Sequence, residues 1–276
     1  MTVLVASDLD RTLIYSRDAA EVDALDGLLC VETYQDAPLS YLSEKAAAGL
    51  AALVERTEFV PVTTRTREQY KRINLPIPPR RYAICANGGH LLVNGVPDPR
   101  WHRAVRQRLA AGSADLAEVS EWLAKTADPQ WTLKHREAED LFCYLVVDRT
   151  AMPSSYVDEM IGWCDPRGWE VSVQGRKVYA VPRDLTKSGA VAEVAGRMEA
   201  DTVLAAGDSL LDAELLAAAD AAVRPGHGEL ADSNWSAPRV QALTERGIAG
   251  GEEAVVEWLL AAADHRVSSA GLGYAL

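Results

Sequence analysis

The feature that most constrains this chain is a short apolar segment followed at once by two carboxylates. Residues 3–6 are apolar or small and predict a buried strand, and Asp8 and Asp10 follow where that strand ends. Alternate side chains of an extended segment share a face, so both carboxylates could point to one site. Open parallel sheets bind ligands beyond the carboxyl ends of their strands. The alternative is a strand that ends in a solvated acidic turn, with Asp10 as a helix cap.

A second segment far along the chain repeats this arrangement. Residues 202–206 are mostly apolar, Gly207 ends them, and Asp208 and Asp212 follow where a helix is expected to begin. If both apolar segments are strands of one parallel sheet, their acids meet at the same edge. Carboxylates, water and phosphate oxygens are the usual ligands of Mg²⁺, so the two segments predict a magnesium site.

Together with two further segments, these residues resemble the four motifs of the haloacid dehalogenase superfamily phosphatases. The motif residues are Asp8 and Asp10 in the first motif, Thr63 in the second, Lys187 in the third, and Asp208 and Asp212 in the fourth. The run from Ile84 to Leu91, with its Asn87-Gly88 turn, resembles the Cof-type and sucrose-phosphatase-like branch. That branch carries a cap domain between the second and third motifs.

The resemblance implies a role for each motif residue in phosphoryl transfer. Asp8 would attack phosphorus and carry a transient aspartyl-phosphate, and Asp10 would act as general acid and then as general base. Thr63 and Lys187 would hold the phosphoryl oxygens. The implied Mg²⁺ ligands are Asp8, the backbone carbonyl of Asp10, Asp208 and Asp212, the last as a support or water ligand.

The resemblance also implies an α/β fold, a Rossmann-like parallel sheet core with an inserted α+β cap domain. We expect the core to comprise residues 1–94 and 184–276 and the cap to comprise residues 95–183. The sequence between the two core segments agrees with this, because it predicts one long helix over residues 101–125 and then two strands, a helix and two strands.

Three further elements are expected in the core. Residues 82–86 predict a strand, and residues 16–41 predict a hairpin flap near the catalytic carboxylates. Residues 252–263 predict an amphipathic closing helix that is followed by a loose tail.

Six further residues are candidates for contacts to the phosphate or to the rest of the substrate. They are Arg11, Thr64, Arg65, Asn87, Arg176 and Lys177. Thr64 replaces the glycine of the Thr-Gly-Arg run in the related phosphatases, and Arg65 keeps its arginine. The alternatives are a solvated helix start for Arg65, turn geometry for Asn87 and ordinary surface charge for Arg176 and Lys177.

Composition excludes some classes of partner. The 276 residues carry 28 Lys and Arg against 40 Asp and Glu, a net charge of -12, which argues against nucleic-acid binding. The start of the chain has no secretory pattern and no apolar run is long enough to span a membrane, so we expect a cytoplasmic protein. The four cysteines are scattered without a metal-binding spacing and predict reduced, buried thiols.

The leading functional hypothesis is a Mg²⁺-dependent phosphatase of a small phosphorylated metabolite, such as a sugar phosphate. A phosphotransferase such as a phosphomutase is one alternative. A protein that keeps the fold and binds a phosphate ligand with weak or no turnover is another. Two departures from the family pattern favour the latter, Arg11 in place of glycine and Leu211 in place of the asparagine beside the last acid.

Overall fold

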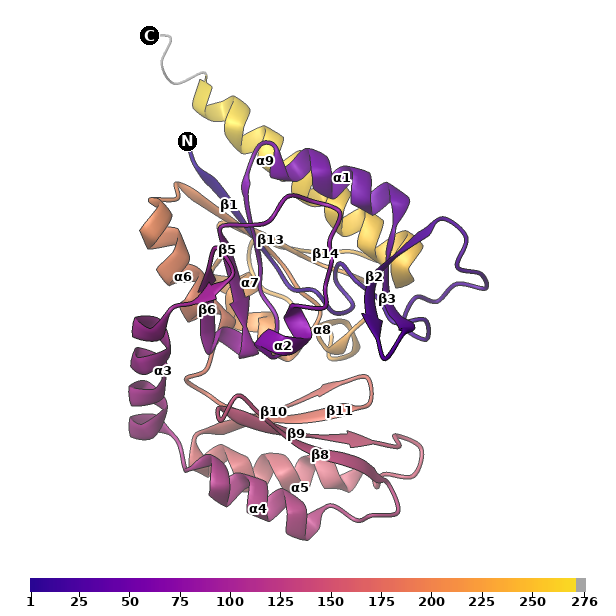
Figure 1. Ribbon diagram of the computed structural model, residues 1–276, viewed down its shortest axis with the longest axis vertical. Helices are drawn as coiled ribbons and strands as arrows, with labels where there is room; N and C mark the ends of the chain where they lie inside the picture. Colours follow the sequence, from indigo (N-terminus) through magenta and orange to yellow (C-terminus); the bar gives the residue numbers. More distant parts are fainter. Residues whose placement is uncertain (272–276) are drawn as a thin grey trace. The chain divides into compact units, whose positions relative to one another are not determined.

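The computed structural model describes residues 1–271, with side chains at all of these positions except 249–250 and 267–271. Its contacts divide the chain into two compact units, which are described separately. The first unit comprises Met1–Pro97 together with Lys187–Leu276, and the second comprises Asp98–Thr186. Figure 1 shows the elements of both.

A parallel sheet forms the centre of the first unit. Its strand order is β14-β13-β12-β1-β4, and every neighbouring pair is parallel. The strands are β1 (Val3–Ser7), β4 (Glu58–Pro61), β12 (Thr202–Ala206), β13 (Ala221–Arg224) and β14 (Val240–Ala242). All five residues of β1 are buried, as expected for a central strand that is covered on both faces. The predicted α/β class with a parallel core is confirmed.

Helices cover this sheet. Helix α1 (Glu44–Val54) lies beside α9 (Glu253–Gly271), which packs on β1, β12 and β13. Helix α7 (Ala213–Ala218) packs on β12 and β13, with α6 (Lys187–Met198) beside it. The apolar side chains between the sheet and the α1–α9 pair include Val3, Val5, Leu50, Leu53, Phe59, Val256 and Leu259. Burial of this apolar surface holds the strand ends in a fixed arrangement.

Smaller elements complete the first unit. A hairpin of β2 (Leu28–Tyr34) and β3 (Ala37–Ser43) forms within the region predicted as a flap. The predicted strand at residues 82–86 is β5 (Tyr82–Cys85), which pairs with β6 (His90–Val93) and thus joins a separate antiparallel sheet with β7 (Val96–Pro97). The short helices are α2 (Arg67–Tyr70), η1 (Ala86–Gly88), η3 (Leu210–Asp212), α8 (Glu229–Asp232) and η4 (Gly247–Glu252).

The second unit is an antiparallel sheet with helices packed on it. Its strand order is β10-β11-β9-β8. Its elements are α3 (Pro99–Gly112), α4 (Leu116–Thr126), β8 (Thr132–Ala138), β9 (Phe142–Val147), α5 (Ser155–Cys164), η2 (Asp165–Arg167), β10 (Trp169–Gln174) and β11 (Lys177–Pro182). This is the predicted order of a helical segment, two strands, a helix and two strands.

The prediction of one helix over residues 101–125 is wrong, because the segment forms α3 and α4 with a break between them. The backbone at the break bonds to the turn that precedes β10, since Ala114 donates to the Arg167 carbonyl at 2.9 Å. The Ala114 carbonyl accepts from the Trp169 indole at 2.9 Å. These tertiary bonds replace the helical ones that a continuous helix would make.

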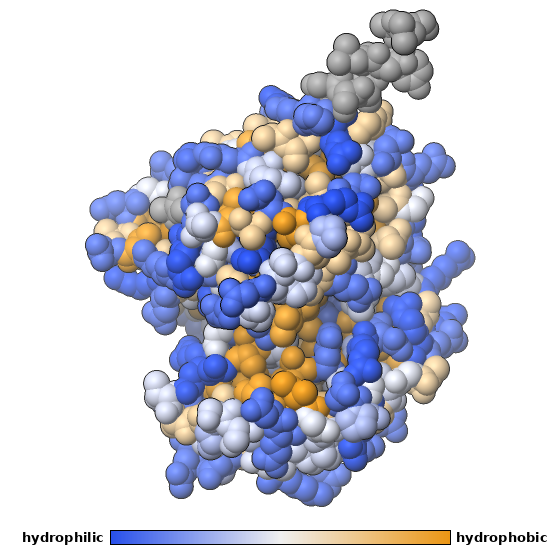
Figure 2. Space-filling view, turned by 180° about the vertical axis from the view of Figure 1, so that it is seen from behind, coloured by the Kyte–Doolittle hydropathy of each residue, from blue (hydrophilic) through white to orange (hydrophobic). Residues whose placement is uncertain are grey.

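The closing helix is longer than predicted. Helix α9 continues to Gly271, so residues 264–271 of the predicted loose tail are helical, and the rest of that tail lies outside the described residues. Among the helices of the described part, none is long and apolar enough to cross a membrane. The face of the molecule in Figure 2 is mainly hydrophilic, with apolar residues at several places and most densely in the lower half of the view.

Candidate active site

Three adjacent strands bring the predicted catalytic residues to one edge of the parallel sheet. Ser7 at the end of β1 stands beside Ala206 of β12 and Pro61 of β4. The Asp8 amide then donates to the Ala206 carbonyl at 2.9 Å. The residues that follow the three strands, among them Asp8, Asp208 and Thr63, therefore leave the sheet at the same end.

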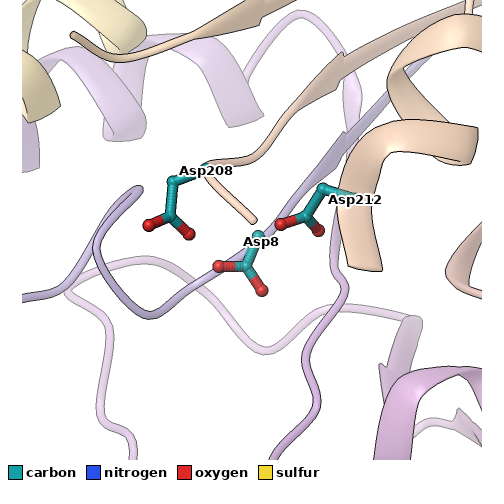
Figure 3. Close-up of side chains that lie close together, drawn as sticks. All are labelled: Asp8, Asp208 and Asp212. Carbon is teal, nitrogen blue, oxygen red and sulfur yellow. The ribbon is translucent and has the colours of Figure 1, made fainter. Parts of the chain in front are cut away.

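Three carboxylates meet at this edge (Figure 3). Asp8, Asp208 and Asp212 each offer an oxygen atom, and these three atoms lie within 4.8 Å of one another. The relative exposure of these residues is 4%, 4% and 0%, respectively. Asp212 also closes the turn before α7, because its Oδ2 accepts from the Ser209 amide at 3.0 Å and from the Ser209 hydroxyl at 2.7 Å.

Lys187, the first residue of α6, balances part of this charge. Its ammonium donates to Oδ1 of Asp8 at 2.5 Å and to Oδ1 of Asp212 at 2.6 Å, and its side chain is 1% exposed. Burial alone would lower the pKa of Lys187, but attraction from Asp212 and Asp8 outweighs burial and raises it. Lys187 is therefore a permanent cation at the centre of the acids.

Burial and mutual repulsion disfavour charge on the acids themselves. Burial is the main cause that raises the pKa of Asp8 to about 7, with Asp212 and Asp10 adding to it and Lys187 opposing it. Burial, followed by repulsion from Asp8 and Asp212, raises the pKa of Asp208 well above its ordinary value. A divalent cation would reverse this, because it favours the ionised form of every carboxylate that it contacts. Buried oxygen ligands with surplus negative charge fit Mg²⁺.

The carboxylate of Asp10 makes a different contact. It forms two hydrogen bonds with the Arg65 guanidinium, from Nε to Oδ2 at 2.6 Å and from Nη2 to Oδ1 at 2.7 Å. Such a paired arrangement fixes both the position and the plane of a carboxylate. Arg65, a candidate for substrate contact, thus orients Asp10.

Arg65 is itself held by Glu32, which the sequence analysis did not single out. The Glu32 carboxylate, which is fully buried, pairs with Arg65 at 2.8 Å and with Arg72 at 3.0 Å. It also accepts from the Ser40 hydroxyl at 2.7 Å. Glu32 and Ser40 belong to β2 and β3, so the hairpin is linked to Asp10 through a chain of charged groups. An acid within a strand that is partly apolar was the one signal of this role in the sequence.

The second-motif segment is buried under the same edge. Thr63 is fully buried, and its hydroxyl accepts from the Arg65 amide at 3.1 Å, while Thr64 is 7% exposed. The backbone amide of Asn87 donates to the Thr63 carbonyl at 3.0 Å, and Asn87 has φ 54. Asn87 therefore serves the turn, since asparagine tolerates this left-handed conformation better than most residues.

Arg11 also reaches the acidic group. Its Nε lies 3.3 Å from Oδ2 of Asp208, and its backbone has φ 62. The Arg11 carbonyl accepts from the Tyr15 hydroxyl at 2.7 Å and from Nε2 of His227 at 2.8 Å. Tyr15 and His227 are buried supports of the first motif that the sequence analysis did not identify.

The two remaining candidates belong to the second unit. Arg176 lies in the turn between β10 and β11, where its carbonyl accepts from the Val147 amide at 2.8 Å. The ammonium of Lys177 lies 5.8 Å from the centre of the Tyr144 ring and 5.9 Å from that of Tyr179. Contacts of this kind between a cation and aromatic rings hold the Lys177 side chain over the sheet.

Solved structures with this architecture include several phosphatases. The sucrose-phosphatase of Synechocystis is 14% identical at a TM-score of 0.62, with 95% of this chain and 98% of that chain covered. A sugar phosphatase of HAD subclass IIB is 14% identical at a TM-score of 0.58, with 94% and 100% covered. A HAD phosphatase of Bacteroides thetaiotaomicron is 14% identical at a TM-score of 0.52, with 94% and 95% covered.

Sequence comparison gives no such likeness: no protein-family model and no curated protein matches the chain. At these identities the structural likeness concerns the fold. The fold that the motif resemblance implies is confirmed. The chain has the fold of the haloacid dehalogenase superfamily phosphatases.

Proposed function

We propose that this chain is a Mg²⁺-dependent phosphatase that hydrolyses a small phosphorylated metabolite through an aspartyl-phosphate on Asp8. The observation that carries the proposal is the buried group in which Lys187 bonds to Asp8 and Asp212 while Asp208 lies within reach of the same ion. The sugar phosphatases among the structures of the same fold support a sugar phosphate or a similar ester as the substrate.

Hydrolysis through Asp8 requires two displacements at phosphorus. In the first, a carboxylate oxygen of Asp8 forms a bond to phosphorus, and the ester oxygen leaves with a proton from Asp10. In the second, a water molecule attacks phosphorus, gives a proton to Asp10 and releases inorganic phosphate, which frees Asp8. Asp10 thus ends in the protonated state in which it began. Arg65 holds Asp10 through both carboxylate oxygens, so one of these two hydrogen bonds has to open while Asp10 carries the proton, and the other keeps the group in place.

Charge stabilisation comes from groups that are in place before the substrate arrives. Lys187 would stabilise the phosphoryl oxygens while it stays bonded to the acids, and the buried Thr63 would bind the same group. Asp8, Asp208 and Asp212 would hold Mg²⁺, which when bound supplies positive charge that offsets the repulsion between nucleophile and phosphate.

The test is a panel of phosphorylated sugars, polyols and nucleotides, with release of inorganic phosphate measured with and without Mg²⁺. We expect at least one ester to be hydrolysed only with Mg²⁺ and Asp8→Asn to abolish the release. The matched control is Asp18→Asn, an exposed aspartate of the same segment, which should retain the wild-type rate. After acid quenching, mass spectrometry should find phosphate on the peptide that contains Asp8.

Three results would contradict this function. Release of phosphate that survives Asp8→Asn removes the assigned nucleophile. Transfer of phosphate to a sugar acceptor in preference to water identifies a phosphotransferase. Calorimetric binding of a phosphate ester without turnover across the panel identifies a binding protein.

A further inference from the structure

Arg11 is the cation of this site that the motif does not require. Its Nε lies 3.3 Å from Oδ2 of Asp208, and this Nε is buried and makes no hydrogen bond among the described residues. The Arg11 side chain is 31% exposed, whereas that of Asp208 is 6% exposed. The contact is thus an ion pair between a buried acid and a cation whose far end reaches water.

The backbone of Arg11 is held by hydrogen bonds, whereas its side chain is held by the ion pair with Asp208. The carbonyl accepts from both Tyr15 and His227. Nδ1 of His227 accepts from the Gly247 amide at 3.2 Å, so Nε2 carries the proton that is donated to Arg11. The guanidinium can therefore leave Asp208 by side-chain rotation alone, without a change in the loop.

The charges of the site divide into two sets. Lys187 is committed to Asp8 and Asp212, to which it donates both of its hydrogen bonds in this site. Asp208 receives its closest positive charge from Arg11. A divalent cation bound to the three acids needs an oxygen of Asp208, the same carboxylate that Arg11 faces.

We propose that Arg11 is the resident counter-ion of Asp208 and competes with the divalent cation for this carboxylate. Binding of the metal displaces the guanidinium toward solvent. Arg11 thereby weakens the affinity for Mg²⁺ relative to a chain with an uncharged residue at this position. The proposal rests on the metal site of the proposed function and concerns a residue to which that function assigns no metal role.

Titration of Mg²⁺ into the metal-free full-length protein by calorimetry tests the proposal. We expect Arg11→Gly and Arg11→Gln to lower the dissociation constant for Mg²⁺ roughly fivefold, the scale of one partly exposed ion pair. Arg11→Lys keeps the charge and should stay close to wild type. Arg17→Gln, at an exposed position of the same segment, is the matched control and should leave the constant unchanged. Glycine suits φ 62, so Arg11→Gly is not expected to harm folding.

The outcomes separate this proposal from the proposed function. Equal dissociation constants in wild type, Arg11→Gly and Arg11→Gln overturn the role of Arg11 and leave the metal site intact. Absence of Mg²⁺ binding in every variant overturns the metal site and the competition together. Mg²⁺ binding that is detectable only in Arg11→Gly and Arg11→Gln supports the competition in its strongest form.

Discussion

The ammonium nitrogen of Lys187 lies 2.5 Å from Oδ1 of Asp8, although the two residues are 179 positions apart in the chain. Lys187 begins α6 and Asp8 follows β1, so the contact joins the start of the third motif to the first. Both side chains are nearly excluded from water. Each charge therefore depends on its partner, because removal of one leaves the other buried and unbalanced.

Lys187→Met should lower kcat and destabilise the metal-free protein. We expect kcat to fall about 10²-fold or more, because a fixed cation at the phosphoryl oxygens is lost. The free energy of unfolding should fall by roughly 3 kcal/mol near neutral pH, where Asp8 and Asp212 would lose their shared cation. Urea denaturation and phosphate release measure the two effects.

The matched control is Lys125→Met, because Lys125 pairs with Glu121 at 2.7 Å on the surface of α4. Lys125→Met should change neither kcat nor the free energy of unfolding appreciably. The destabilisation by Lys187→Met should shrink as pH falls, since protonated carboxylic acids no longer need the cation. If Lys187→Met lowered the free energy of unfolding equally at all pH values, the loss of stability would not have an electrostatic origin.

Arg65→Met should lower kcat more than it changes KM. Arg65 holds Asp10 through two hydrogen bonds, and a carboxylate that is free to rotate spends less time in line with the reacting oxygen. We expect a fall in kcat of roughly tenfold or more. Arg72→Met is the control, because Arg72 shares Glu32 with Arg65 but does not bond to Asp10. Steady-state kinetics that show a rise in KM at unchanged kcat would instead identify Arg65 as a substrate contact.

The strand ends of the core could be predicted because the pattern was local. An apolar segment followed by acids marks both Asp8 and Asp208, and parallel pairing alone brings them to one edge. The sequence also predicted a cation, Lys187, at the start of a helix and a hydroxyl group, Thr63, after the end of a strand. None of these positions depends on the details of side-chain packing.

The ion pairs around these residues could not be predicted, because they depend on tertiary register. Glu32 meets Arg65 only because the β2–β3 hairpin has a particular irregular pairing near Glu32. The break between α3 and α4 likewise depends on a turn more than fifty residues away, at Gly168, where a Cβ atom would lie 2.3 Å from the Gly112 carbonyl oxygen. Helical propensity carries no information on such contacts.

Glu252 should make the protein less stable as pH rises. This residue is fully buried, and burial raises its pKa to about 9 from the 4.5 of a free side chain. Between these two values the unfolded chain releases a proton that the folded chain keeps, so the free energy of unfolding decreases with pH. Glu252→Gln removes this contribution. Between pH 5 and 9 the free energy of unfolding of the variant should therefore fall less steeply with pH, by the slope that corresponds to about one proton per molecule.

The control for Glu252→Gln is Glu55→Gln, an exposed position at the end of α1. It should leave the dependence on pH unchanged. The measurement is urea denaturation at a series of pH values. An equal slope for wild type and Glu252→Gln would show that Glu252 is ionised in the folded protein.

Gly228→Ala should weaken metal binding without any change in the charge of the site. Gly228 has φ +89, and a Cβ atom there would lie 2.4 Å from Oδ2 of Asp208. Gly95→Ala is the matched control, because Gly95 has φ +77 with nothing within 4 Å of its Cβ position. Both variants carry the backbone strain of a non-glycine residue at positive φ, and the strain is larger for Gly228→Ala, because φ 89 with ψ 175 is a conformation that almost only glycine adopts. Only Gly228→Ala forces Asp208 to move, both its carboxylate and its backbone carbonyl, which would lie 2.6 Å from the added Cβ, so only this variant should raise the dissociation constant for Mg²⁺ in calorimetry. Equal constants for the two variants would mean that the position of Asp208 does not govern the affinity for the metal.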